Sequence, residues 1–65
     1  MRIEVNGAAQ QLEADTLAQV LAQLGYGAAA VATALNGRFV AAADRAQTAI
    51  AAGDRVEVLS PMQGG

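Results

Sequence analysis

Few side chains in this sequence of 65 residues have the chemistry of a catalyst. The chain contains no Cys, no His and no Lys, and its charged residues are six carboxylates and four arginines. This composition excludes thiol nucleophiles, zinc–thiolate sites, imidazole general bases, phosphate-loop lysines and Schiff-base lysines. We therefore predict that the chain is not an enzyme and that it has neither a catalytic residue nor a metal site.

The carboxyl-terminal residues are the remaining candidates for chemistry. The sequence ends in Gly64-Gly65 after a short segment in which Pro61 ends strand pairing, because proline lacks a backbone N–H. The last six residues can extend at most about 20 Å, and glycine has the narrowest cross-section of any residue. We expect a domain over residues 1–60, followed by a flexible, extended tail over residues 61–65 that can enter a partner's active site.

Composition and charge exclude other kinds of partner. The formal net charge is -2, so the chain lacks the basic surface that nucleic-acid binding requires. No run of about 18 apolar residues is present, and the first residues lack a signal-peptide pattern. We expect a cytoplasmic protein with no nucleic-acid or membrane partner. Apolar residues make up 54% of the chain, but 17 residues are Ala, which predicts a single modest core.

Two Asn-Gly pairs, Asn6-Gly7 and Asn36-Gly37, predict β-hairpin turns. Both central positions of such a turn favour positive φ, which Asn and Gly tolerate. The Gly53-Asp54 pair predicts a further turn before the last strand. Apolar residues on either side of these turns predict short strands over residues 1–5, 9–14, 31–35, 38–41 and 55–59.

A single amphipathic helix is expected over residues 16–24. Thr16 and Gln19 form a capping-box pair, and Gly25 is placed to end the helix in the left-handed conformation. The spacing i, i+3, i+4 and i+7 gives the helix one apolar stripe, made by Leu17, Val20, Leu21 and Leu24.

The order of these elements predicts an α+β fold of the β-grasp type. Two hairpins, one main helix and a final strand can form a mixed sheet of about five strands, with the helix across one face and the first and last strands central and parallel. A ferredoxin-like fold would need a second full helix, for which residues 41–52 contain too few large apolar side chains. Residues 42–48 are predicted as a turn, one helical turn or both, and Ile50 is expected to fill the core.

Several other side chains have competing interpretations. For Phe39, core filling is favoured over the alternative of a contact with a docking partner. Met62 is interpreted as a docking contact, because its adaptable side chain suits a docking surface. The small apolar face that carries Ala32 and Ala34 would be a docking surface if exposed and core if covered. Solvated faces are predicted for three arginines: Arg38, Arg45 and Arg55.

Four motifs occur in order along essentially the whole chain: Val5-Asn6-Gly7, Leu35-Asn36-Gly37 with Val40, Gly53-Asp54-x-Val56-Glu57-Val58, and Ser60-Pro61-Met62-Gln63-Gly64-Gly65. The last motif, with its terminal glycine pair, is the most specific. With these motifs the sequence resembles the ThiS family, whose members are ubiquitin-like β-grasp sulfur carriers of thiamin thiazole biosynthesis. Ala42 stands near a position where many relatives carry Pro, a difference that we do not expect to affect the chemistry.

The resemblance implies that the chain is a recycled cosubstrate whose reactive group is the carboxyl group of Gly65. A ThiF-type adenylyltransferase, which uses ATP and Mg, would adenylate this group, and a persulfide sulfur donor would convert it into a thiocarboxylate. A ThiG-type thiazole synthase would then take the sulfur, and the carboxylate would be regenerated. Met62, Gln63 and Gly64 would thread into the partners' active sites, and the chain itself would bind no cofactor.

Three alternatives remain open from the sequence. The first is a MoaD-type carrier that supplies sulfur for molybdopterin or another product, although such carriers are usually longer. The second is a ubiquitin-like modifier that forms isopeptide bonds with lysines of target proteins. The third is a binding domain whose Gly64-Gly65 ending is incidental.

Overall fold

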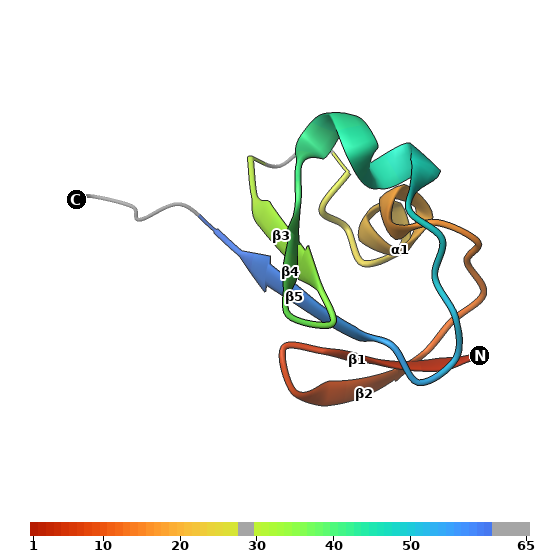
Figure 1. The fold of residues 1–65 in the computed structure, drawn as a ribbon. Coiled ribbons are helices and arrows are strands. Elements are labelled where there is room, and N and C mark those ends of the chain that lie inside the picture. The colour runs from red at the N-terminus through yellow and green to blue at the C-terminus, as the bar shows by residue number, and fades with distance from the viewer. Residues whose placement is uncertain (28–29, 61–65) are drawn as a thin grey trace.

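A computed structural model describes residues 1–27 and 30–60 of the chain. It contains five strands, one α-helix and one 3-10 helix (Figure 1). In chain order these elements are β1 (Arg2–Val5), β2 (Ala8–Gln11), α1 (Leu17–Gln23), β3 (Ala32–Leu35), β4 (Arg38–Val40), η1 (Ala42–Gln47) and β5 (Arg55–Leu59). The predicted tail over residues 61–65 lies outside the described residues.

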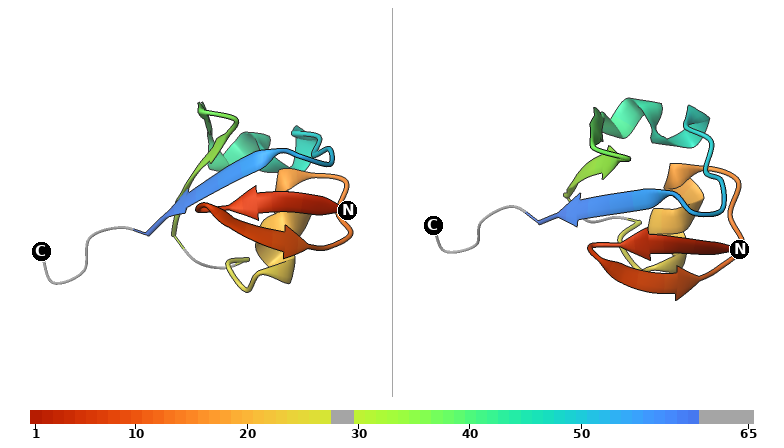
Figure 2. Two further views of the ribbon diagram at one scale, coloured as in Figure 1. Left: turned by 90° about the horizontal axis from the view of Figure 1, so that it is seen from below. Right: turned by 60° about the horizontal axis from the view of Figure 1, so that its bottom comes forward.

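The strands form one mixed sheet in the order β2-β1-β5-β3-β4. The two central strands, β1 and β5, run parallel, whereas β1 pairs with β2 and β3 pairs with both β4 and β5 in antiparallel fashion. Figure 2 shows β1 and β5 side by side, with α1 across one face of the sheet. The predicted β-grasp arrangement is confirmed, and the segment where a ferredoxin-like fold would need a second full helix holds the 3-10 helix η1.

Both predicted hairpin turns are confirmed by their backbone angles. Asn6 and Gly7 have φ values of 51° and 83°, and Asn36 and Gly37 have φ values of 52° and 84°. Strand β2 is shorter than the predicted segment 9–14. Its last residue, Gln11, lies opposite Arg2, the first residue of β1, and beyond it the backbone N–H of Leu12 donates to the carbonyl oxygen of Met1 at 2.9 Å.

Helix α1 begins as its sequence predicts. The hydroxyl oxygen of Thr16, the N-cap residue, accepts a hydrogen bond from the backbone N–H of Gln19 at 3.3 Å. The side-chain oxygen of Gln19 accepts in return from the backbone N–H of Asp15 at 2.6 Å, one residue before the cap. The two side chains thus satisfy two backbone donors. The helix is followed by Gly25, whose φ of +90° is the left-handed conformation expected there.

The core lies between α1 and the inner face of the sheet. The second and fourth residues of β1 and of β5 face this core, as period-two alternation predicts. Ile50, which follows η1, is also buried, so its predicted core-filling role is confirmed. The buried apolar side chains are Ile3, Val5, Leu17, Val20, Leu21, Ile50, Val56 and Val58.

Helix η1 lies beside α1 and has no buried residue of its own (Figure 1). The predicted solvated face is wrong for Arg45 in this helix. Its guanidinium is partly buried, and Nη2 donates a hydrogen bond to the carbonyl oxygen of Val31 at 2.6 Å. Because η1 lacks large apolar side chains, this arginine provides a polar attachment to the sheet. Arg38 and Arg55 are exposed, as predicted.

Candidate functional site

An apolar patch lies on the outer face of the sheet, away from α1. Phe39 of β4 lies opposite Ala34 of β3, and Leu59 of β5 lies opposite Ala32 of β3. Alternate residues of a strand share one face, so these four side chains share the face opposite the buried Thr33. Phe39 is 74% exposed and Leu59 is 66% exposed. We call this surface the apolar patch; it consists of Ala32, Ala34, Phe39 and Leu59.

The predicted core role of Phe39 is wrong, and the register of the second hairpin explains why. The two-residue turn at Asn36-Gly37 places Arg38 opposite Leu35, so Phe39 must lie opposite Ala34 and Val40 opposite Thr33. Val40 therefore packs against the core, and Phe39 faces outward. An exposed aromatic side chain beside small neighbours is typical of a docking surface. The exposure of Phe39 rules out core filling, and its contact with a docking partner stays a prediction, as does docking on the Ala32 and Ala34 face.

The apolar patch is at the carboxyl end of β5. Leu59 is the last residue of this strand and a member of the patch. In Figure 1, β5 points toward the end of the molecule opposite the N-terminus. The patch is therefore next to the point where residues 61–65 continue the chain. The four predicted tail residues, Met62, Gln63, Gly64 and Gly65, lie outside the described residues.

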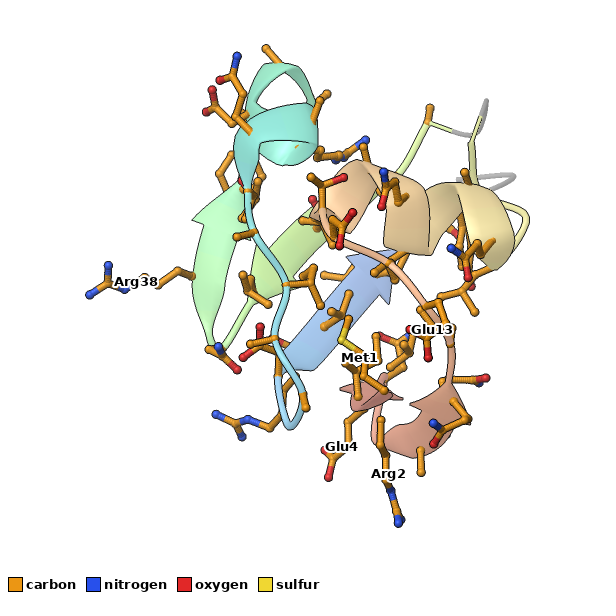
Figure 3. The ribbon with its side chains drawn as sticks, turned by 90° about the vertical axis from the view of Figure 1, so that its right-hand side faces the viewer. Met1, Arg2, Glu4, Glu13 and Arg38 are labelled. Carbon is orange, nitrogen blue, oxygen red and sulfur yellow. The ribbon has the colours of Figure 1, made fainter. Side chains whose placement is uncertain are left out.

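The other half of the outer face is charged. Glu4 of β1 lies opposite Arg55 of β5, and Arg2 and Glu57 occupy neighbouring positions on the same face. Figure 3 shows the Arg2 and Glu4 side chains extending away from the core, while Arg38 extends outward from the β4 edge. Two shallow hollows over this half are lined in part by Glu4 and Gly7. Their charged lining residues are arginines and glutamates, and none of the lining residues carries a hydroxyl group.

A separate ion pair lies near the start of β1, away from the apolar patch. The Met1 ammonium group lies 2.8 Å from Oε2 of Glu13 and also donates a hydrogen bond to the carbonyl oxygen of Leu12 at 2.8 Å (Figure 3). The hydrogen bond from this ammonium, and then its charge, lower the pKa of Glu13 below the ordinary value. This contact attaches the first residue to the segment between β2 and α1.

Two asparagines have a role that the sequence did not predict. Asn6 Oδ1 accepts a hydrogen bond from Val58 N at 2.8 Å, and Asn6 Nδ2 donates to Val58 O at 3.1 Å. At the other end of β5, Asn36 Oδ1 accepts from Arg55 N at 2.9 Å. The Asn-Gly pairs indicated the turns, but these contacts join residues far apart in sequence, so no local pattern could reveal them.

Two features, a cluster of metal ligands and a membrane-spanning helix, are absent from residues 1–27 and 30–60. These residues contain no group of three or more acidic, His or Cys side chains placed to hold a metal ion. Within the same part of the chain, no helix has the length and apolar character needed to cross a bilayer.

The chain matches the model of the ThiS family over residues 2–65. The chain belongs to the ThiS family. It is also similar to the crystal structure of the thiamine biosynthesis protein ThiS from Geobacter metallireducens, with a TM-score of 0.82, 30% sequence identity and full coverage of both chains. The NMR solution structure of a thiamine biosynthesis protein from the same organism has a TM-score of 0.80 and 28% identity, over 100% of this chain and 88% of that one. No curated protein matches this sequence.

Membership of the ThiS family agrees with the chemistry of the described residues. ThiS proteins are small sulfur carriers of thiamin biosynthesis rather than catalysts. This ThiS-family chain has the β-grasp fold, with an exposed apolar patch on the outer face of its sheet.

Proposed function

We propose that this chain carries sulfur as a thiocarboxylate on Gly65 for the formation of the thiamin thiazole. A ThiF-type adenylyltransferase activates Gly65, a persulfide donor supplies the sulfur, and a ThiG-type thiazole synthase consumes it. The observation that carries the proposal is the position of the apolar patch at the end of β5, in a chain that matches the ThiS family through residue 65.

The proposed chemistry requires an external activating site. A carboxylate is a poor acyl donor, so the partner uses ATP and Mg to convert the Gly65 carboxyl group into an acyl-adenylate and pyrophosphate. The terminal sulfur of the persulfide then bonds to the carbonyl carbon while AMP leaves. A thiol next takes the other sulfur of the resulting disulfide, which releases the thiocarboxylate. This chain has no Lys and no phosphate-binding loop, so it supplies the acyl group only.

The apolar patch provides the surface on which the partners dock. Aromatic residues contribute disproportionately to binding energy at interfaces, and Phe39 offers such a side chain with most of its surface exposed. Once the patch is docked, residues Met62, Gln63 and Gly64 thread into the partner's active site and bring Gly65 to the bound ATP. Transfer of the sulfur restores the carboxylate, so the chain is a recycled cosubstrate.

Intact mass spectrometry tests this proposal. The full chain is incubated with a ThiF-type enzyme, ATP, Mg and a persulfide donor, beside a control chain that lacks Gly65. We expect the mass of the full chain to increase by the difference between one sulfur and one oxygen atom, and the mass of the control chain to stay unchanged. An unchanged mass with a competent partner would contradict the carrier function. Conjugates with other proteins would instead indicate a ubiquitin-like modifier, and sulfur that passes to molybdopterin but not to thiazole would indicate a MoaD-type carrier.

A further inference from the structure

Strand β5 extends beyond the strand that flanks it on one side. The backbone pairing of β1 with β5 comprises Glu4 opposite Arg55 and Val5 opposite Val56. The backbone N–H of Asn6 donates to the carbonyl oxygen of Val56 at 2.9 Å, and the chain then turns away into the first hairpin. On the other side, β3 accompanies β5 as far as Leu59. Within residues 1–27 and 30–60, no backbone pairs with the last residues of β5 on the β1 side.

The side chain of Asn6 takes the place of that missing neighbour. Its amide both accepts from Val58 N at 2.8 Å and donates to Val58 O at 3.1 Å, so it replaces a carbonyl and an N–H group that would come from two different residues of a continued parallel strand. The φ of 51° at Asn6 turns the backbone into the hairpin while the side chain continues toward β5. Asn6 thereby extends the hydrogen bonding of β1 to Val58, two residues before the end of the described chain.

We propose that Asn6 is a positioning residue that fixes the direction in which the chain leaves the sheet at Val58 and thereby presents the carboxyl-terminal residues to the activating partner. This inference rests on the proposed carrier function. Without the Asn6 amide, β3 is the only described element that holds the backbone of the last part of β5. This part of the strand can then rotate about the line of its hydrogen bonds to β3. While a partner's active site holds the tail extended, a rotation by about 20° at Val58 would displace the end of a seven-residue segment by about 8 Å. Acyl transfer requires placement of the reacting atoms to within about 1 Å.

Asn36 provides a matched control at the opposite end of β5. Its φ of 52° is nearly that of Asn6, and Gly follows both residues. Its side chain also clamps β5, because Oδ1 accepts from Arg55 N at 2.9 Å and Nδ2 donates to Asp54 Oδ1 at 3.1 Å. Substitution by Gly removes the side-chain hydrogen bonds of either asparagine, and Gly tolerates the positive φ without strain. Each substitution deletes two amide hydrogen bonds, which are part-buried for Asn6 and exposed for Asn36, but only Asn6→Gly acts at the end from which the tail leaves.

The first arm of the test uses the isolated full chain and needs no partner. Amide hydrogen exchange and NMR residual dipolar couplings are measured for the wild type, Asn6→Gly and Asn36→Gly. For Asn6→Gly we expect the exchange rate of the Val58 amide to rise by about tenfold or more and the Leu59 and Ser60 N–H vectors to reorient. Asn36→Gly should leave these vectors in place. Unchanged Val58 exchange and unchanged vectors in Asn6→Gly would overturn the proposal, whether or not the chain is a sulfur carrier.

The second arm separates docking from presentation. Affinity for a ThiF-type enzyme and the single-turnover adenylation rate at saturating enzyme are measured at a temperature at which all variants are folded. We expect Asn6→Gly to lower the rate by about tenfold with a Kd within about twofold of the wild type, and Asn36→Gly to change neither. An equal loss of rate in both variants, or a wild-type rate in Asn6→Gly, would overturn the positioning role. Failure of the wild type to be adenylated would instead contradict the proposed function, and the first arm would still decide whether Asn6 fixes the direction of the chain.

Discussion

The guanidinium of Arg45 donates a hydrogen bond from Nε to the hydroxyl oxygen of Thr33 at 3.0 Å. The same hydroxyl group donates to the carbonyl oxygen of Val40 at 2.8 Å, and Thr33 is only 2% exposed. One buried hydroxyl therefore joins η1 to both strands of the hairpin that carries Phe39. The hairpin that bears most of the apolar patch is thus held from its inner side by a polar contact.

Replacement of Thr33 by Val should destabilise the domain by about 1–3 kcal/mol, because the buried hydroxyl contact with Arg45 and Val40 is lost while the volume is kept. The free energy of unfolding is measured by urea denaturation. Thr48→Val is the matched control, since the Thr48 hydroxyl donates to the Asp44 carbonyl oxygen in an exposed contact. The control should change the free energy by less than about 0.5 kcal/mol. Equal effects of the two substitutions would contradict the role assigned to Thr33.

Leu17→Ala should cost about 2–5 kcal/mol of stability, because Leu17 is fully buried at the start of α1 and its truncation leaves a cavity. A domain of this size has few other buried side chains to compensate, so we expect a large fraction of the chain to be unfolded at 37 °C. Circular dichroism during thermal unfolding measures the change. A melting curve that coincides with the wild type would show that the core is not organised around α1.

Phe39→Ala should weaken binding to a ThiF-type enzyme by about 1–2 kcal/mol or more, while the thermal midpoint of the free domain stays nearly unchanged. The reason is that Phe39 is exposed in the isolated chain and can be buried only in a complex. Arg38→Ala is the control, because Arg38 is exposed on the same strand but belongs to the opposite face of the sheet. Titration calorimetry measures both affinities. If Phe39→Ala binds the ThiF-type enzyme with wild-type affinity, the apolar patch is not part of the binding interface.

The contact between Met1 and Glu13 predicts a small dependence of stability on pH. The hydrogen bond and charge of the ammonium lower the pKa of Glu13 below 4.5 in the folded state. This stabilisation is therefore fully present above the unfolded pKa and is lost as the pH falls through the folded pKa. We expect the difference in unfolding free energy between the wild type and Glu13→Gln to shrink on acidification and at high salt, because Glu13 is exposed. A difference that stays constant down to about pH 2 would contradict this assignment.

The features that the sequence predicted correctly depend on local chemistry. Asn6-Gly7 and Asn36-Gly37 favour positive φ wherever they occur, so the hairpins could be placed from the sequence alone. The helix cap at Thr16 and the spacing of the apolar residues after it are equally local. Once these elements were ordered, few arrangements of a mixed sheet remained, and the β-grasp topology followed.

The features that the sequence did not predict depend on register and long-range contacts. Phe39 and Val40 are adjacent apolar residues on a short edge strand, so alternation could not indicate which of them faces the core. Arg45 is covered only because η1 lies close to β3, and the bonds of Asn6 join residues that are 52 positions apart. The predicted roles of residues 62–65 depend on a partner and stay predictions.

The fate of labelled sulfur tests whether this chain carries sulfur on Gly65 to the thiazole. The full chain is charged with isotopically labelled sulfur from a persulfide donor by a ThiF-type enzyme, purified, and then mixed with a ThiG-type thiazole synthase and its carbon substrates in a single turnover. We expect fragment masses to place the label on residue 65 before the reaction, and we expect the label to appear in the thiazole product as the chain returns to its original mass. Label on another residue, or a charged chain that gives no labelled thiazole with an active synthase, would contradict the proposed function.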